Sequence, residues 1–308
     1  MSASRDFLVE IGTEELPPKS LLNLSAAFAD GVAKGLKDAG VAYKSLEAFA
    51  TPRRLAVRVR KLIEQQPDRP LEKRGPPVKA AFDANGGPTQ AALAFARSCG
   101  VEVSALEKIE TPKGEWLVFR GTETGARTVD LLPAIVTASL DALPIAKRMR
   151  WGAGEAQFVR PVHWVLMLWG KDVVETEILG QKAGNVTFGH RFMAPKALRV
   201  SSPASYVGTL LKRGKVVADV NARRDSIRAG VTAAAAKLDG IAVIDDSLLD
   251  EVTGLVEWPV PLAGRFDPQF LELPAEVPIA TMQEHQRYFP VRDAQGKLMP
   301  WFITVSNI

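Results

Sequence analysis

The sequence has 308 residues, of which 46% are hydrophobic and 24% are charged, a balance typical of a globular protein with a sizeable core. The net charge of +4 is compatible with a nucleic-acid partner without requiring one. The single cysteine, Cys99, excludes an internal disulfide and a multi-thiolate metal site. The first six residues lack an apolar stretch, so we expect no secretory signal, and the longest apolar run, 162–169, is too short to span a bilayer. We therefore expect a cytoplasmic protein with no membrane association.

The first half of the chain alternates predicted strands and helices, because apolar residues recur there with periods of two and of about 3.6. In chain order, we expect a strand at 7–11, a helix at 20–38, strands at 46–50 and 55–63, a loop at 65–80, a helix at 89–98, a hairpin formed by 107–111 and 116–121, and a helix at 128–143. The strand at 55–63 alternates apolar residues with Ala56, Arg58 and Arg60, which predicts one apolar and one cationic face.

The second half opens on a basic segment and contains further strands and helices. We expect a nearly continuous apolar strand at 162–169 with a hairpin partner at 172–178, a helix at 221–238, a helix at 247–256 capped by Ser247, a segment at 260–266, a helical segment at 278–285 and two terminal strands. We expect four cations of the helix at 221–238 on or near its polar face: Arg223, Arg224, Arg228 and Lys237.

These elements predict an α+β fold, in the sense of α/β-like mixed sheets with flanking helices, divided into two domains. Pro144 and the change in sequence pattern near it place the boundary between a first domain at 1–146 and a second at 147–308. The last residues form an apolar, β-branched run typical of a core strand. We therefore expect the sequence to be a piece of a longer protein.

Sequence motifs for catalysis are absent. There is no Walker loop, no Gly-x-Gly-x-x-Gly after a strand and no nucleophile elbow. His163, His190 and His285 are widely separated, so no metal-ligand spacing is present. Glu14 and Glu15 follow a strand and precede a helix, where carboxylates usually offset the helix dipole. We expect no catalytic residue and no metal ligand in this chain.

Basic clusters are the stronger signal, because each lies beside an aromatic, glycine or proline residue. The densest is the segment at 147–151, which combines three cations with a tryptophan. Arginine suits phosphate through its planar fork of donors, and aromatic rings suit stacking on bases. A solvated charged face is the alternative for any single cluster. The candidate nucleic-acid-binding residues are Arg53, Arg54, Lys73, Arg74, Lys147, Arg148, Arg150, Trp151, Arg160, Arg191 and Arg287.

The same clusters belong to ordered sequence blocks that resemble the beta subunit of bacterial glycyl-tRNA synthetase. The blocks begin with Phe-Leu-Val-Glu-Ile-Gly-Thr-Glu-Glu-Leu-Pro-Pro at 7–18 and cover essentially the whole chain. The later blocks are 51–56, 74–76, 147–152, 158–164, 187–192 and 282–289. Gln283 stands where the family pattern has a lysine, which removes any lysine contact expected there.

The resemblance implies a place in an enzyme that joins glycine to tRNA(Gly) using ATP. The family enzyme is an α2β2 tetramer whose alpha subunit holds glycine, ATP and Mg²⁺, while the beta subunit handles tRNA. This chain would be the N-terminal part of the beta subunit, inactive alone and without a bound cofactor. The resemblance also implies that part of the chain has the editing-type fold of the phenylalanyl-tRNA synthetase beta chain.

Two alternatives to a tRNA-binding, alpha-supporting role stay open. One is a hydrolytic editing domain for misacylated tRNA, for which His163, His190 and His285 are the candidate residues. The other is a purely structural subunit-interaction module, whose basic clusters face acidic patches on the alpha subunit.

Overall fold

A computed structural model describes residues 3–83 and 85–308. The chain forms two compact units, of which the first comprises residues 1–64 and 129–308 and the second comprises residues 65–128. The predicted boundary between residues 146 and 147 falls inside the first unit. Strand β1 (Ser4–Thr13) pairs antiparallel with β9 (Val162–Trp169), so segments from both sides of that boundary share one sheet.

The first unit is built on a seven-stranded sheet with the order β11-β12-β9-β1-β3-β2, in which β10 also pairs with β9. Its pairings are antiparallel except for the parallel pair of β12 and β9. The remaining strands are β2 (Ser45–Thr51), β3 (Arg54–Ile63), β10 (Asp172–Val173), β11 (Glu177–Ile178) and β12 (Gln181–Gly184). The predicted partner at 172–178 is thus two short strands, and only β10 pairs with β9.

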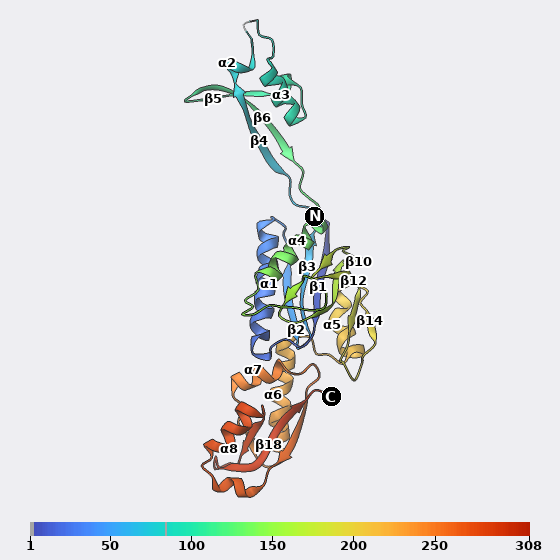
Figure 1. The fold of residues 1–308 in the computed structure, drawn as a ribbon, viewed down its shortest axis with the longest axis vertical. Coiled ribbons are helices and arrows are strands. Elements are labelled where there is room, and N and C mark those ends of the chain that lie inside the picture. Colours follow the sequence, from blue (N-terminus) through green and yellow to red (C-terminus); the bar gives the residue numbers. More distant parts are fainter. Residues whose placement is uncertain (1–2, 84) are drawn as a thin grey trace. The chain divides into compact units, whose positions relative to one another are not determined.

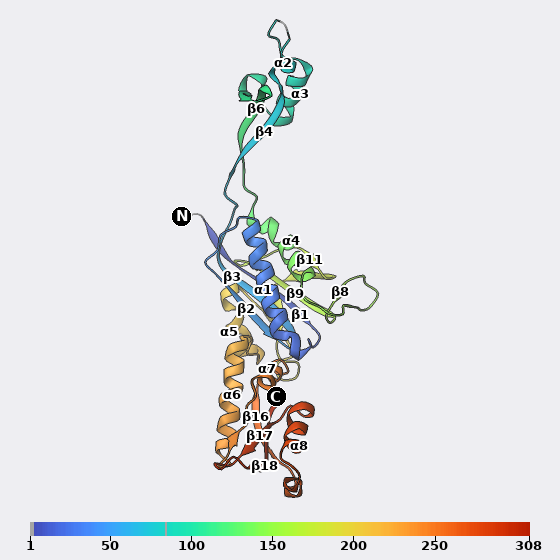
Figure 2. The same ribbon diagram turned by 90° about the vertical axis from the view of Figure 1, so that its left-hand side faces the viewer.

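One face of this sheet carries the largest core. Phe7, Val9 and Ile11 of β1 point into it and meet two helices, α1 (Leu21–Asp38) and α4 (Thr128–Asp141). Figures 1 and 2 show α1 lying along the sheet with α4 beside it. The helices pack closely because Gly35 has no side chain: a Cβ there would lie 2.6 Å from Ile135.

The opposite face of the sheet is covered by a second, smaller core. Leu8 of β1 and Leu166 of β9 point to this side and contact Tyr206 and Leu210. These residues come from α5 (Tyr206–Thr209) and the π-helical turn Leu210–Gly214 that follows it. The short antiparallel pair β13 (Val186–Phe188) and β14 (Ala197–Arg199) precedes them. Glu10 therefore points to the side on which Tyr206 packs, within a strand that is otherwise apolar.

The C-terminal part of the first unit is a four-stranded sheet with the order β15-β17-β18-β16. The strands are β15 (Ile241–Ala242), β16 (Val260–Arg265), β17 (Phe289–Arg292) and β18 (Leu298–Ser306), and the helices are α6 (Val220–Ala236), α7 (Asp246–Thr253) and α8 (Glu276–Ala280). Residues of α6, α7, β17 and β18 share one apolar core. Helix α7 is capped by Asp245 rather than by Ser247, because the Asp245 carboxylate accepts the backbone N–H of Leu248.

The second unit is a three-stranded antiparallel sheet with two helices on it. Its order is β4-β6-β5, and the elements are β4 (Arg69–Pro77), β5 (Glu107–Thr111), β6 (Gly114–Glu123), α2 (Val78–Ala81) and α3 (Gln90–Cys99). A small core joins Leu117 of β6 to Ala81 and Ala92 of the helices. The loop predicted at 65–80 is wrong over β4, whose proline and charge content conceals an exposed strand.

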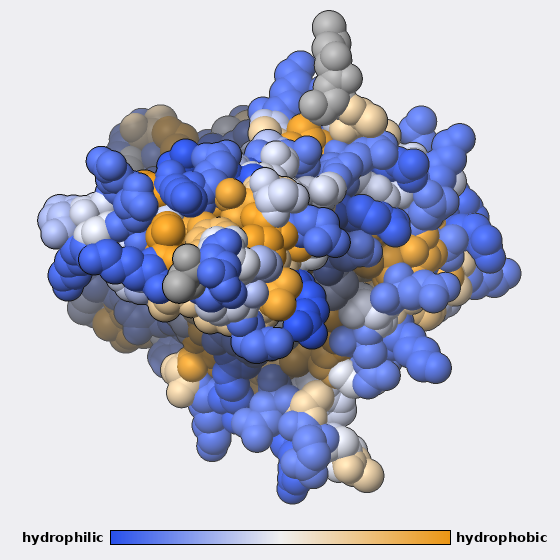
Figure 3. Space-filling view, turned by 90° about the horizontal axis from the view of Figure 1, so that it is seen from above, coloured by the Kyte–Doolittle hydropathy of each residue, from blue (hydrophilic) through white to orange (hydrophobic). Residues whose placement is uncertain are grey.

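The observed fold confirms the predicted α+β class, with several sheets and helices in the first unit and one sheet with helices in the second. Within the described residues, no helix combines the length and apolarity needed to cross a membrane. Hydrophilic residues cover most of the face drawn in Figure 3, and hydrophobic residues gather there in separate spots. The predicted likeness to an editing-type fold stays a prediction.

Candidate nucleic-acid interface

Several sequence blocks meet at one end of the main sheet. The backbone N–H of Thr13, at the end of β1, donates to Arg53 O at 2.9 Å, and the N–H of Glu14 donates to Pro161 O at 2.9 Å. Three segments distant in the sequence, at 12–16, 51–54 and 160–164, are therefore held together. This convergence explains why glutamate, arginine and histidine residues from separate blocks become neighbours here.

Arg54 lies at the centre of a buried polar network beneath this end. Its side chain is fully enclosed and pairs with two carboxylates, Glu10 at 3.3 Å and Glu257 at 3.2 Å. Its Nε donates to Thr51 Oγ1 at 3.0 Å, and Nη2 donates to the backbone carbonyl of Phe188 at 2.9 Å. Burial lowers the pKa of Arg54, but Glu257 and Glu10 outweigh it and raise that pKa. The predicted contact of Arg54 with tRNA therefore does not fit this structure.

Both carboxylates in the network have further donors. Glu10 accepts from Trp164 Nε1 at 2.5 Å, from Thr187 Oγ1 at 2.5 Å and from the hydroxyl of Tyr206. Glu257 accepts from Thr51 Oγ1 at 2.6 Å. A buried charge is tolerated only when it is paired and hydrogen-bonded. The network thus links β1, β2, β3, β9, β13, α5 and the segment before β16.

Arg223 is a second enclosed arginine that the sequence pattern placed wrongly. It lies on α6, fully buried, and donates to three backbone carbonyls: Thr253 O at 3.1 Å, Val217 O at 2.5 Å and Ala50 O at 2.8 Å. Burial lowers its pKa to about 10. The predicted polar-face position is wrong for Arg223, because its side chain is enclosed and binds carbonyls of β2, of the last residue of α7 and of the segment before α6.

The surface above the network carries a mixed charged cluster. Glu14 accepts from His163 Nε2 at 3.1 Å and pairs with Arg191, whose Nη1 also lies 3.9 Å from Glu15. Burial raises the pKa of Glu14, but hydrogen bonds from Arg191 and His163 lower it below the ordinary value. Glu14 thus pairs with two sequence-predicted site residues rather than acting mainly on the helix dipole. The cluster is accessible, since these side chains are roughly half exposed.

Arg53 and Arg160 border this cluster. Arg53 is partly buried, with its guanidinium carbon 5.7 Å from the centre of the Trp164 ring. Burial lowers its pKa, although the charge of Glu257 opposes that effect. The Nε atom of Arg160 donates to Glu15 O at 3.0 Å. Arg53 Nε has no hydrogen-bond partner among the described residues, which leaves that donor unsatisfied.

The basic segment at 147–160 forms a short hairpin of β7 (Met149–Arg150) and β8 (Gln157–Phe158). Lys147 is exposed, while Arg150 is exposed and pairs with Glu155 at 3.1 Å. Arg148 instead donates to the carbonyls of Leu140 and Asp141 at the end of α4, so it caps that helix. Trp151 is half-buried against the main core.

Comparison with known proteins decides the family. Residues 7–308 match the family described as "Glycyl-tRNA synthetase beta subunit". The chain belongs to this family. It is 57% identical over 307 residues to the glycine–tRNA ligase beta subunit of Marinobacter nauticus, 55% over 304 residues to that of Hahella chejuensis and 53% over 306 residues to that of Pseudomonas aeruginosa. In each case 99% of this chain and 44% of the relative are covered.

The chain therefore spans less than half the length of these beta subunits, and family membership confirms the resemblance drawn from the ordered sequence blocks. The relatives' name places them in a ligase, of which this chain corresponds to one part.

Two further predicted tRNA-binding positions of this family member lie in the second unit. Lys73 is exposed, and the guanidinium carbon of Arg74 lies 3.9 Å from the centre of the Trp116 ring. Arg287, in the C-terminal part, pairs with Glu251 at 2.7 Å.

Histidines complete the inventory of this beta-subunit segment. His190 is buried, and its Nδ1 accepts the backbone N–H groups of Phe192 and Met193 at 3.3 and 3.2 Å. Its Nε2 therefore carries the proton, and it has no partner among the described residues. Across those residues, no three His, Cys, Asp or Glu side chains come together in a way that could hold a metal ion.

Sequence reasoning missed Glu10 and Glu257 as partners of Arg54. A signal existed for Glu10, because an acid inside the apolar run at 7–11 requires a buried partner. Glu257 gave no such signal, since it lies 203 residues after Arg54 and precedes β16 in an irregular segment. Only the fold brings these groups together.

Proposed function

We propose that this chain is the N-terminal part of a glycyl-tRNA synthetase beta subunit and supports the ATP-dependent ligation of glycine to tRNA(Gly). In this proposal it binds tRNA and the catalytic alpha subunit, works in the cytoplasm within an α2β2 tetramer, and leaves ATP and Mg²⁺ to the alpha subunit. The observation that carries the proposal is the family match over residues 7–308. On this basis the isolated chain forms no glycyl-adenylate.

The hairpin segment at 147–160 is the part best suited to contact tRNA. It contains four cations and a single acid, Glu155. Lys147 is exposed, and the exposed ion pair of Arg150 with Glu155 contributes only about 0–1 kcal/mol. A phosphate can therefore replace Glu155 as the partner of Arg150 at little cost. Arg148 holds α4 and positions the hairpin without being free for RNA.

A second group of cations surrounds the charged cluster at the end of the main sheet. Arg53, Arg160 and Arg191 are the candidates that remain there once Arg54 is assigned to the buried network. Arg191 has to exchange Glu14 for a phosphate, which costs more than the exchange at Arg150 because both Glu14 and Glu15 lie near it. We propose that this group contributes less to tRNA affinity than the hairpin.

Salt dependence of tRNA(Gly) binding tests this assignment. Each phosphate contact adds roughly one to the slope of log affinity against log salt concentration. Replacing both Lys147 and Arg150 by alanine should weaken binding and lower that slope by about two. Lys34→Ala combined with Lys37→Ala is the matched control, since both are exposed cations on α1. Unchanged affinity and slope in the double variant would refute the assignment.

One observation favours hydrolytic editing as a second candidate function. His163 is accessible and its Nε2 lies 3.1 Å from a Glu14 oxygen, and a histidine oriented by a carboxylate is a common general-base arrangement. Deacylation of alanyl-tRNA(Gly) by the chain, and its loss in His163→Ala, would support this function. A wild-type chain that does not accelerate deacylation above the buffer rate rules it out.

A further inference from the structure

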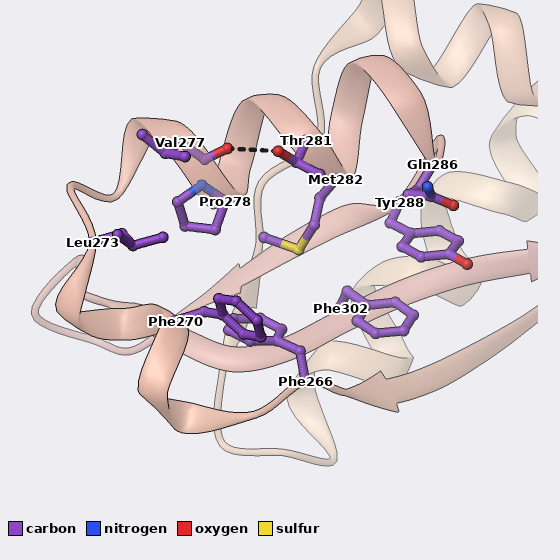
Figure 4. Close-up of a pocket in the computed structure, with 10 residues that line it drawn as sticks. All are labelled: Phe266, Phe270, Leu273, Val277, Pro278, Thr281, Met282, Gln286, Tyr288 and Phe302. Atoms are coloured by element: carbon purple, nitrogen blue, oxygen red, sulfur yellow. Dashed lines mark hydrogen bonds between the residues drawn. The ribbon is translucent and has the colours of Figure 1, made fainter.

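An apolar pocket lies in the C-terminal part of the first unit, and none of the candidate tRNA-binding arginines and lysines lines it. Its volume is about 340 Å³, which is within the range of roughly 300–1,000 Å³ typical of binding pockets. Figure 4 shows the helical segment with Val277, Pro278 and Met282 on one side, and Phe270 and Phe302 on the other. The ring of Tyr288 stacks on that of Phe302 with centroids 4.3 Å apart, which closes one end.

The pocket gathers apolar side chains that a protein normally buries. Phe270, Leu273 and Val277 are 48%, 46% and 50% exposed, and all three line it. Exposed apolar side chains are common when they are scattered, but a contiguous group marks a site of interaction. The helical turn Thr281–His285 contributes Met282, and the hydroxyl of Thr281 is used internally, donating to Val277 O at 3.0 Å.

The charge around the pocket identifies what kind of partner fits. Residues 266–286 contain four acids and no lysine or arginine, in a protein whose net charge is +4. The acids are Asp267, Glu272, Glu276 and Glu284, and all are exposed. The first three directly adjoin pocket-lining residues in the sequence and are called the acidic rim, whereas Glu284 lines a separate hollow together with Lys19 and Arg287. None of the four acids forms an ion pair with another described residue. An acidic rim repels RNA phosphates and attracts basic side chains.

The two arginines that flank residues 266–286 do not change the negative net charge of this segment. Arg265 lies over the Trp301 ring, with its guanidinium carbon 5.6 Å from the ring centre. Arg287 is held by Glu251 at 2.7 Å, and its backbone has a φ of 59°. A non-glycine residue in this left-handed region costs energy, so its position is fixed by its surroundings. Arg287 is therefore held by α7 and by the backbone carbonyl of Glu284, to which its Nη1 donates, and it does not line the pocket.

We propose that this pocket binds an amphipathic helix of a protein partner, with large apolar side chains in the pocket and lysine or arginine residues against the acidic rim. Helices bind apolar grooves through side chains spaced three, four or seven residues apart. Phe270, Val277 and Met282 receive the apolar side chains, while Glu272 and Glu276 attract the basic ones. The inference is independent of tRNA binding, because it uses none of the residues assigned to tRNA.

Two matched synthetic helical peptides test this proposal. Both carry leucines at positions i, i+3 and i+7, and they differ only in having lysine or glutamate beside the leucines. Fluorescence anisotropy with the 308-residue chain should show binding of the lysine peptide and at least roughly tenfold weaker binding of the glutamate peptide. Equal binding of the two peptides, or binding of neither, would overturn the proposal.

Variants at exposed positions separate the apolar and the charged contributions without disturbing the fold. Phe270→Ser and Val277→Ser should each weaken the lysine peptide several-fold, whereas Ile241→Ser should not, since Ile241 is 64% exposed but lies outside the pocket. Glu272→Lys together with Glu276→Lys should reverse the preference toward the glutamate peptide. Displacement of the lysine peptide by a tRNA transcript would instead identify an RNA site and contradict the proposal.

Discussion

Removing the Arg54 guanidinium should unfold the first unit far more readily than removing any exposed cation. Arg54→Met keeps most of the side-chain volume but leaves Glu10 and Glu257 without their shared positive partner. Breaking a buried ion pair from one side typically costs about 3–5 kcal/mol, because it leaves an uncompensated buried charge. The loss falls mainly on Glu257, since Glu10 keeps Trp164, Thr187 and Tyr206 as donors, and Glu257 keeps only Thr51 among the side chains described.

Thermal and urea unfolding followed by circular dichroism measure this effect. For a domain of this size, about 1 kcal/mol shifts the midpoint by roughly 2–4 °C, so Arg54→Met should lower it by about 6–20 °C. Arg150→Met is the control, and its exposed ion pair predicts a change within about 1 kcal/mol. Adding Glu257→Gln to Arg54→Met should recover part of the loss, because a neutral amide replaces the unpaired charge. If Arg54→Met alone changes the free energy of unfolding by less than about 1 kcal/mol, as expected for an exposed pair, the reasoning is refuted.

Three other substitutions test separate contacts. Glu47 pairs with Arg58, and hydrogen bonds from Arg58 lower the pKa of Glu47 below the ordinary value of 4.5. Glu47→Gln should therefore lower the free energy of unfolding at pH 7. The difference between this variant and wild type in urea unfolding should shrink as the pH falls below 4.5, because wild-type Glu47 becomes protonated. Gly12→Ala would place a Cβ 1.9 Å from the Trp164 ring, so we expect a lower unfolding midpoint and a changed tryptophan emission spectrum. Arg148→Ala removes a cap from α4 and should cost about 1 kcal/mol in urea unfolding; no change would contradict the capping role.

Local patterns predicted most of the individual elements. The apolar run of β9 and the helical spacing of α1 are strong signals, and their observed bounds agree closely with the predicted ones. Strand β4 was missed because its prolines and charges are typical of loops, and its pairing with β6 supplies order that its own residues do not indicate. The pairing of β1 with β9 joins segments about 155 residues apart, and no local pattern contains that information.

The candidate site was predicted only in part, because an arginine gives the same sequence signal whether it is buried or exposed. Arg53 and Arg54 are adjacent in the sequence, yet the side chain of Arg54 is enclosed and that of Arg53 is only partly buried. What separates them is the placement of Glu10 and Glu257, which depends on the tertiary fold. The exposed cations Lys147 and Arg150 stay predictions as tRNA contacts, and the structure adds that both side chains are accessible.

Crosslinking of the chain to a tRNA(Gly) transcript, followed by mass spectrometry of the modified peptides, tests the central claim most directly. The account predicts crosslinks within residues 147–160, a smaller yield near Arg53 and Arg191, and none within residues 266–286, where the acidic rim repels phosphate. Lys147→Ala combined with Arg150→Ala should remove most of the yield. Crosslinks concentrated in residues 266–286, or unaffected by the double substitution, would contradict the assignment of tRNA binding to the basic hairpin.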